Sequence, residues 1–177
     1  MNNRLLHGVA RLFRRIVSDQ SGQELAETAM VLPLLLFLAL GIVEFGSMFS
    51  TTYTLTSLGR EGANIAARGA PLDTVNALML ENGADIGLST LGGVITSRVV
   101  VIDTIPTVTA QAATGSYAGH SRIGLVNSAA TGLLQLATDE GASFVVVEIF
   151  YIQDALTPLE SILAATIPDT LYSRAVF

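Results

Sequence analysis

The chain has 177 residues and no cysteine, which excludes disulfides, cysteine-ligated zinc or iron–sulfur clusters and a thiol nucleophile. Half of the residues are hydrophobic and only 14% are charged, and the length allows one small domain. All basic residues are arginines, and residues 44–177 hold five of them against twelve acids. Because that balance of −7 would repel phosphate backbones, we expect no nucleic-acid binding.

The first 22 residues form a basic leader. Their net charge is +3, because one acid, Asp19, accompanies four arginines: Arg4, Arg11, Arg14 and Arg15. By the positive-inside rule, this end is expected to stay in the cytoplasm.

An apolar stretch from Ala29 to Phe49 follows, and at about 1.5 Å per residue it is long enough to cross the roughly 30 Å hydrocarbon core of a bilayer. It holds a single charge, Glu44, which we expect at the outer interface, more often solvated than functional. Pro33 removes one backbone hydrogen bond and predicts a kink one turn into the membrane.

A cleaved secretory signal is the competing interpretation of this region, with small residues near Ala39-Leu40-Gly41 as the cleavage site. Three acids, Asp19, Glu24 and Glu27, lie between the last arginine and the apolar stretch. A signal peptide passes straight from basic to apolar residues, so the membrane helix is the favoured prediction.

Beyond the membrane the helix is predicted to continue to Arg68, since no proline interrupts it. Small residues at helical spacing would form a smooth face that lets another helix approach closely: Gly59, Gly62, Ala63 and Ala66. The alternative, that the glycines only weaken this helix, has equal weight.

The remaining residues, 70–177, are expected to form a small α+β domain with a short antiparallel sheet and flanking helices. In chain order we predict a helix from Pro71 to Gly83, a strand Ile95–Ile105, a loop 106–122, a helix Leu125–Leu136, a strand Ser143–Ile152, a helix Thr157–Ile167 that starts with a capping box, and a strand Leu171–Phe177.

No residue pattern in the chain indicates catalysis, a cofactor or a metal. Outside the leader the one histidine is His120, which we expect to be an ordinary loop residue. Asp139-Glu140 lacks the spacing of a calcium loop and is interpreted as solvated charge. We therefore predict that the protein is not an enzyme.

Three blocks of sequence resemble TadE-like proteins, the minor pilins or pseudopilins of the tight adherence (Flp) type IV pilus system. They are Gly22-Gln-Glu-Leu-Ala-Glu27 with the apolar run through Pro33, Gly41-Ile-Val-Glu44-Phe-Gly46, and Arg60-Glu-Gly-Ala-Asn-Ile-Ala-Ala-Arg68. The resemblance implies cleavage between Gly22 and Gln23 by an inner-membrane prepilin peptidase. Glu27 would then be the motif acid, able to pair with the new amine of Gln23 on the same or a neighbouring subunit. The alternative is a solvated carboxylate at the cytoplasmic interface.

The resemblance also implies a function. A chain of this length, with Thr28 where major Flp pilins have tyrosine, is similar to a minor pilin that assembles or initiates the pilus rather than to the fibre subunit. Its implied partners are sister pseudopilins, the major Flp pilin and the inner-membrane assembly platform, besides the lipid bilayer. Gln23 stands where type IV pilins favour phenylalanine, which leaves N-methylation open.

The sequence thus predicts three parts: a prepilin leader (1–22), a membrane-spanning and extended helix (23–69) and an extracytoplasmic domain (70–177). The protein would cross the bacterial inner membrane once, and whether it enters the fibre stays open. The alternative is a membrane-tethered periplasmic binding or scaffold module unrelated to pili.

Overall fold

The computed structural model describes residues 20–133, 139–157 and 170–177 of the chain. Its longest element is α2 (Gln20–Ala67), which continues through Pro33. The chain separates into two compact units, residues 1–43 and 44–177, so the C-terminal part of α2 belongs to the folded domain. The predicted long helix ending near Arg68 is confirmed.

After α2 the helical elements α3 (Leu72–Asn82), η1 (Ala84–Ile86) and α4 (Leu88–Leu91) lead into the sheet. Gly69 takes a φ of +97°, which only glycine adopts without strain, and Pro71 then sets up the first turn of α3. The predicted helix between Pro71 and Gly83 is confirmed, whereas η1 and α4 had no sequence prediction.

The sheet is antiparallel with strand order β2-β1-β3-β4, built from β1 (Gly92–Ile102), β2 (Ile105–Gly115), β3 (Ser143–Ile152) and β4 (Thr170–Val176). This confirms the α+β class and the two C-terminal strands. Two predictions were wrong. Residues 106–115 belong to β2 rather than to a loop. Residues 125–133 form no helix, and the rest of that predicted helix, like most of Thr157–Ile167, lies outside the described residues.

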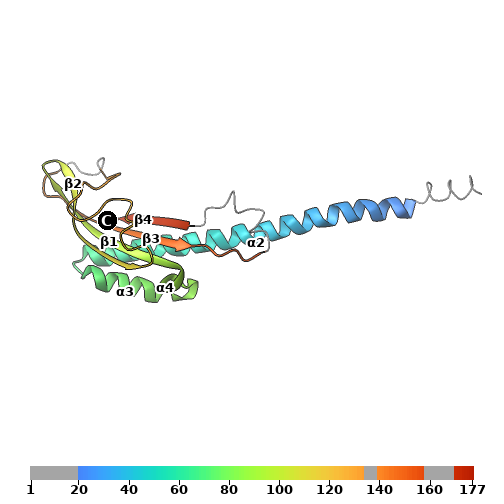
Figure 1. Cartoon of the computed structure of the whole chain (residues 1–177), viewed down its shortest axis with the longest axis horizontal. Helices are drawn as coiled ribbons and strands as arrows, with labels where there is room; N and C mark the ends of the chain where they lie inside the picture. The colour runs from blue at the N-terminus through green and yellow to red at the C-terminus, as the bar shows by residue number, and fades with distance from the viewer. Residues whose placement is uncertain (1–19, 134–138, 158–169) are drawn as a thin grey trace, which may run out of the picture. The chain divides into compact units, whose positions relative to one another are not determined.

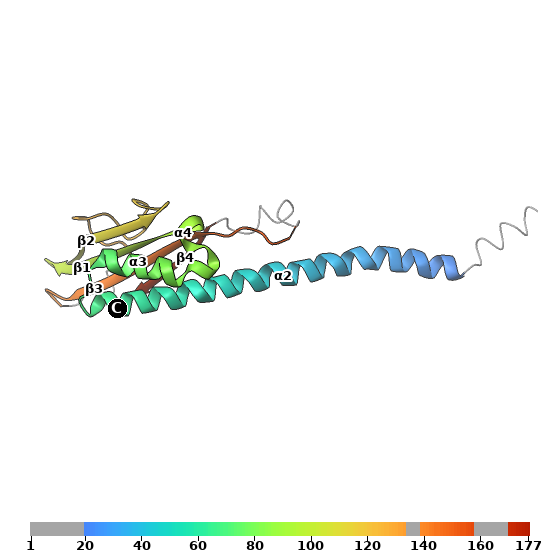
Figure 2. The ribbon, with the colours of Figure 1, turned by 90° about the horizontal axis from the view of Figure 1, so that it is seen from below.

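One face of the sheet is covered by α2 and α3, which lie side by side along the strands (Figures 1 and 2). The core between them is aliphatic: Leu55 and Leu58 of α2 and Met79 of α3 pack against Val147 and Ile149 of β3. Asn76 of α3 is also buried there, and it accepts a 2.6 Å hydrogen bond from the hydroxyl of Thr96 on β1.

The other face of the sheet is covered by the irregular segment 116–133. Ile123, Ala130 and Leu133 of this segment form a second apolar cluster with Val99 and Val146 of the sheet. The segment is held by backbone bonds to the edge strand, such as Asn127 N to Val108 O at 2.8 Å and Ala130 N to Pro106 O at 2.6 Å. These bonds replace the helical ones that the sequence pattern predicts.

Candidate functional site

The predicted processing site lies in the first turns of α2. Gly22, Gln23 and Glu27 are all exposed, and Glu27 lines a shallow hollow on the helix surface together with Glu24, Thr28, Val31, Leu32 and Leu35. The hydroxyl of Thr28 donates a 2.9 Å hydrogen bond to the backbone carbonyl of Glu24. This part of the helix is therefore apolar on most of its surface, with two neighbouring carboxylates at its start.

Pro33 is exposed inside α2, where its ring removes the amide that would bond to the carbonyl of Ala29. The helix from Gly22 to Ala67 is long and apolar enough to cross a membrane, with a mean hydropathy of 2.3 in its most apolar window. Only 6% of that window is buried inside the structure, so its side chains are not those of a soluble core helix.

The predicted small-residue face of α2 lies against the protein's own domain. Ala63 and Ala66 are fully buried in the first apolar cluster. A Cβ on Gly59 would lie 3.5 Å from the Cβ of Ala175, and a Cβ on Gly62 would lie 2.2 Å from the sulfur of Met79. The small-residue face therefore packs within the chain, with Gly62 against the side chain of Met79 on α3 and Gly59 against Ala175 on β4.

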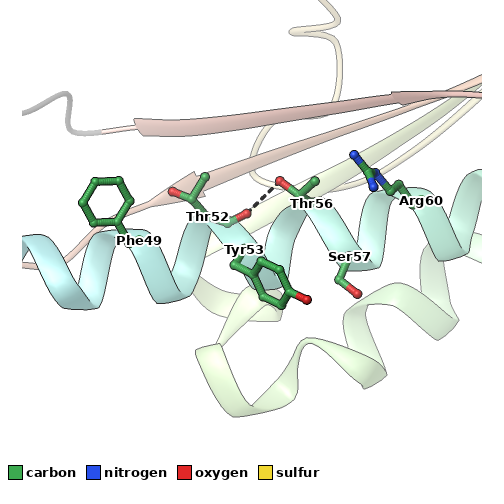
Figure 3. A pocket seen from close by; sticks show the side chains of 6 residues that line it. All are labelled: Phe49, Thr52, Tyr53, Thr56, Ser57 and Arg60. Atoms are coloured by element: carbon green, nitrogen blue, oxygen red, sulfur yellow. Dashed lines mark hydrogen bonds between the residues drawn. The ribbon is translucent and has the colours of Figure 1, made fainter.

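On the opposite, bare face of α2, no described part of the domain covers the helix. Six residues at helical spacing line an open groove along it: Phe49, Thr52, Tyr53, Thr56, Ser57 and Arg60 (Figure 3). The two aromatic side chains are 76% and 78% exposed, and the hydroxyl of Thr56 is bonded to the carbonyl of Thr52 at 2.8 Å. This face therefore presents two aromatic rings beside three hydroxyls, of which that of Thr56 is bonded to the helix backbone, and it ends at the guanidinium of Arg60.

Glu44 is buried, which corrects the prediction of a solvated carboxylate. Its side chain is only 2% exposed. It accepts hydrogen bonds from the amide of Leu156 at 3.1 Å and from the amide and hydroxyl of Thr157 at 3.1 and 2.9 Å. The sequence could not show this contact, because 112 residues separate Glu44 from Leu156.

A second buried carboxylate, Glu148 of β3, was missed by the sequence analysis. It accepts hydrogen bonds from the hydroxyl of Ser121, from the amide of Arg122 at 2.9 Å and from the phenol of Tyr172 at 2.8 Å. Burial, followed by the hydrogen bond to Glu148, raises the pKa of Tyr172 above its usual range. The available signal was a lone acid inside the apolar run Phe144–Tyr151.

Aromatic rings surround this carboxylate. Phe150 stacks on Tyr117 with centroids 5.2 Å apart, and the guanidinium of Arg122 lies 4.1 Å from the ring centre of Tyr172. The rings and Glu148 come from β3, β4 and the segment 116–133, so they fasten that segment to the sheet.

The remaining candidate residues carry no site. His120 is exposed and meets the ring of Tyr117 edge-on at 6.0 Å. Glu140 is exposed but accepts 3.1 Å bonds from the amides of Asp103 and Thr104, whose φ angles of 50° and 67° form the β1–β2 turn. Within residues 20–133, 139–157 and 170–177, no group of three or more histidine or acidic side chains could hold a metal ion.

A family model described as "TadE-like protein" matches residues 22–64, which confirms the resemblance over that segment. Residues 65–177 lie outside the match. No curated protein and no solved structure matches the chain. The match covers the predicted processing site, the apolar helix and the bare groove, which places the family signature on α2.

Proposed function

We propose that this protein is a membrane-anchored minor pilin or pseudopilin that takes part in assembling or initiating a tight adherence (Flp) pilus. Support comes from the match of residues 22–64 to the TadE-like family and from one helix, among the described residues, that is long and apolar enough to anchor the chain in a membrane. The family is a structural one, which agrees with a protein that is not an enzyme.

The bare face of α2 is the observation that carries this proposal. The described part of the domain covers the side of the helix that bears Leu55, Leu58 and Gly62. The opposite side keeps Phe49 and Tyr53 exposed. Phe49 ends the apolar stretch that lipid can cover, whereas Tyr53 lies beyond that stretch and needs another cover. A neighbouring pilin helix, from a sister pseudopilin or the major pilin, would cover these rings during assembly.

The proposal includes processing and topology. A prepilin peptidase cleaves between Gly22 and Gln23, the leader stays in the cytoplasm and the domain lies outside it, anchored in the inner membrane. The assembly platform then takes up the processed chain. Intact mass of the protein from cells with and without the peptidase tests the cleavage, with a mature chain starting at Gln23 expected only when the peptidase is present.

The assembly role is tested on the bare face itself. Phe49→Ser combined with Tyr53→Ser should abolish or strongly reduce surface pili while the protein still accumulates, because both side chains are exposed and support no core. Leu125→Ser, at a side chain 55% exposed in the segment 116–133, is the matched control and should leave piliation unchanged. Normal pili with both rings removed, together with an uncut leader, would favour the tethered binding or scaffold module.

A further inference from the structure

The chain that leaves β3 returns to α2 at Glu44. Figure 1 shows this segment running along the helix after the end of β3. Its contact with the helix is the carboxylate of Glu44, which bonds to the backbone of Leu156 and Thr157. The side chain of Leu156 is nevertheless 67% exposed, and that of Asp154 is exposed as well.

The length of the uncharged part of α2 determines how deep this contact lies. Between Glu27 and Glu44 the helix has sixteen uncharged residues, which at 1.5 Å each span about 24 Å. The hydrocarbon core of a bilayer is about 30 Å thick. If α2 crosses the membrane, the hydrocarbon must therefore extend past at least one of the two glutamates.

Extension past Glu44 is the favourable direction. On that side the next charge on the helix is Arg60, whereas Glu24 lies only three residues before Glu27. Glu24 and Glu27 are exposed, so both would enter lipid unshielded. Glu44 is 2% exposed and its carboxylate is bonded to two amides and a hydroxyl, which is how an acid is tolerated within a membrane.

We propose that residues 153–157, here called the foot, lie in the bilayer leaflet on the side of the domain. Leu156 contacts the acyl chains there, and Asp154 lies nearer the water. Irregular backbone is tolerated at membrane depth only where its polar groups are satisfied. Glu44 satisfies the amides of Leu156 and Thr157, so this end of the foot is the part suited to lipid. The foot gives the domain a second contact with lipid besides α2, and it depends on α2 spanning the membrane but not on a role in pili.

Because the chain has no cysteine, single cysteines can report depth without background labelling. Leu156→Cys is labelled with a small fluorophore, and the full chain is reconstituted in phosphatidylcholine vesicles. Quenching is measured with lipid-borne nitroxide and with aqueous iodide. Leu36→Cys, 57% exposed in the apolar helix, is the lipid control, and Leu125→Cys is the water control.

If the foot lies in lipid, nitroxide lipid should quench the label at position 156 nearly as strongly as the label at position 36. Iodide should quench the label at position 156 several-fold less than the label at position 125. Strong iodide quenching at position 156 overturns the proposal. Protection from both quenchers also overturns it, since protein rather than lipid would then cover Leu156. The label at position 36 separately shows whether α2 has inserted.

The role of Glu44 is tested in the same vesicles. Glu44→Ala removes the acceptor of the two amides, so the label at position 156 should move toward water and its iodide quenching should rise at least two-fold. The label at position 36 should not change. Unchanged quenching at position 156 would show that Glu44 does not hold the foot and would overturn that part of the proposal.

Discussion

The phenol of Tyr172 on β4 donates a 2.8 Å hydrogen bond to the buried carboxylate of Glu148 on β3. The carboxylate is completely buried. Its two further donors, Ser121 and Arg122, belong to the segment 116–133, which covers the face of the sheet opposite α2 and α3. One acid thus joins the last strand to that segment. A buried carboxylate is tolerable because each donor replaces water that it has lost.

Tyr172→Phe should destabilise the domain by about 1.5 to 3 kcal/mol, the range for a hydrogen bond to a charged group. The ring stays in place over Phe150, so the change isolates the hydroxyl. Tyr53→Phe is the matched control and should change stability by less than about 0.5 kcal/mol, because Tyr53 is 78% exposed. Denaturant unfolding of the full chain in detergent, followed by near-ultraviolet circular dichroism, measures both. Equal stability of the two variants would contradict this role of Glu148.

The same phenol predicts a dependence on alkaline pH. Burial and the bond to Glu148 raise the pKa of Tyr172 above the ordinary value of 10.0, so the unfolded state ionises first. The stabilisation by its hydroxyl should be complete below about pH 10 and decline as the pH rises further. Unfolding free energies of the wild type and of Tyr172→Phe, compared from pH 8 to 11, should converge above pH 10. A phenolate of Tyr172 that appears in the folded protein near pH 10 would refute the prediction.

Gly62→Ala should destabilise the domain although alanine is the better helix former, because the new Cβ would meet the buried sulfur of Met79 at 2.2 Å. Gly59→Ala is the control: its Cβ would lie at an ordinary 3.5 Å from Ala175, so we expect a neutral effect or a gain of up to about 1 kcal/mol. Thermal unfolding of both variants is the measurement.

A double-mutant cycle identifies the cause of the effect at Gly62. In a Met79→Ala background the side-chain atoms that the new Cβ would meet are absent, so adding Gly62→Ala should no longer destabilise the domain. If Gly62→Ala costs the same in both backgrounds, the close packing of α2 on α3 is not the reason for the glycine.

Replacing Glu27 by alanine or glutamine should leave cleavage after Gly22 intact but prevent pilus assembly. The reason is that the new amine of Gln23 on a neighbouring subunit would lose its counter-charge where the packed helices of the assembly exclude water and lower the dielectric constant. Glu24→Gln, one turn earlier in the same hollow, should assemble normally. Immunoblots for processing and electron microscopy of surface pili compare the variants. Normal pili in both Glu27 variants would leave Glu27 as an interfacial charge, and loss of cleavage would assign it to peptidase recognition.

Local sequence patterns predicted the elements that are strongly apolar or clearly delimited. The long helix, the helix between Pro71 and Gly83 and the strand Ser143–Ile152 were found because their periodicity or their end signals are strong. The edge strand β2 was missed because Ile105–Gly115 is rich in threonine and alanine. Such a strand is stabilised by its ladder to β1 rather than by its own composition.

The sequence by itself determined that residues 22–67 hold a segment able to cross a membrane, that this segment carries the TadE-like signature, and that the domain is of the α+β class. All three depend on residues close together in the chain. Only the tertiary structure decided which side of α2 the domain covers and where Glu44 and Glu148 find their donors. Those donors lie up to 113 residues away, and no local pattern indicates which distant amide or hydroxyl will replace the water around a buried carboxylate.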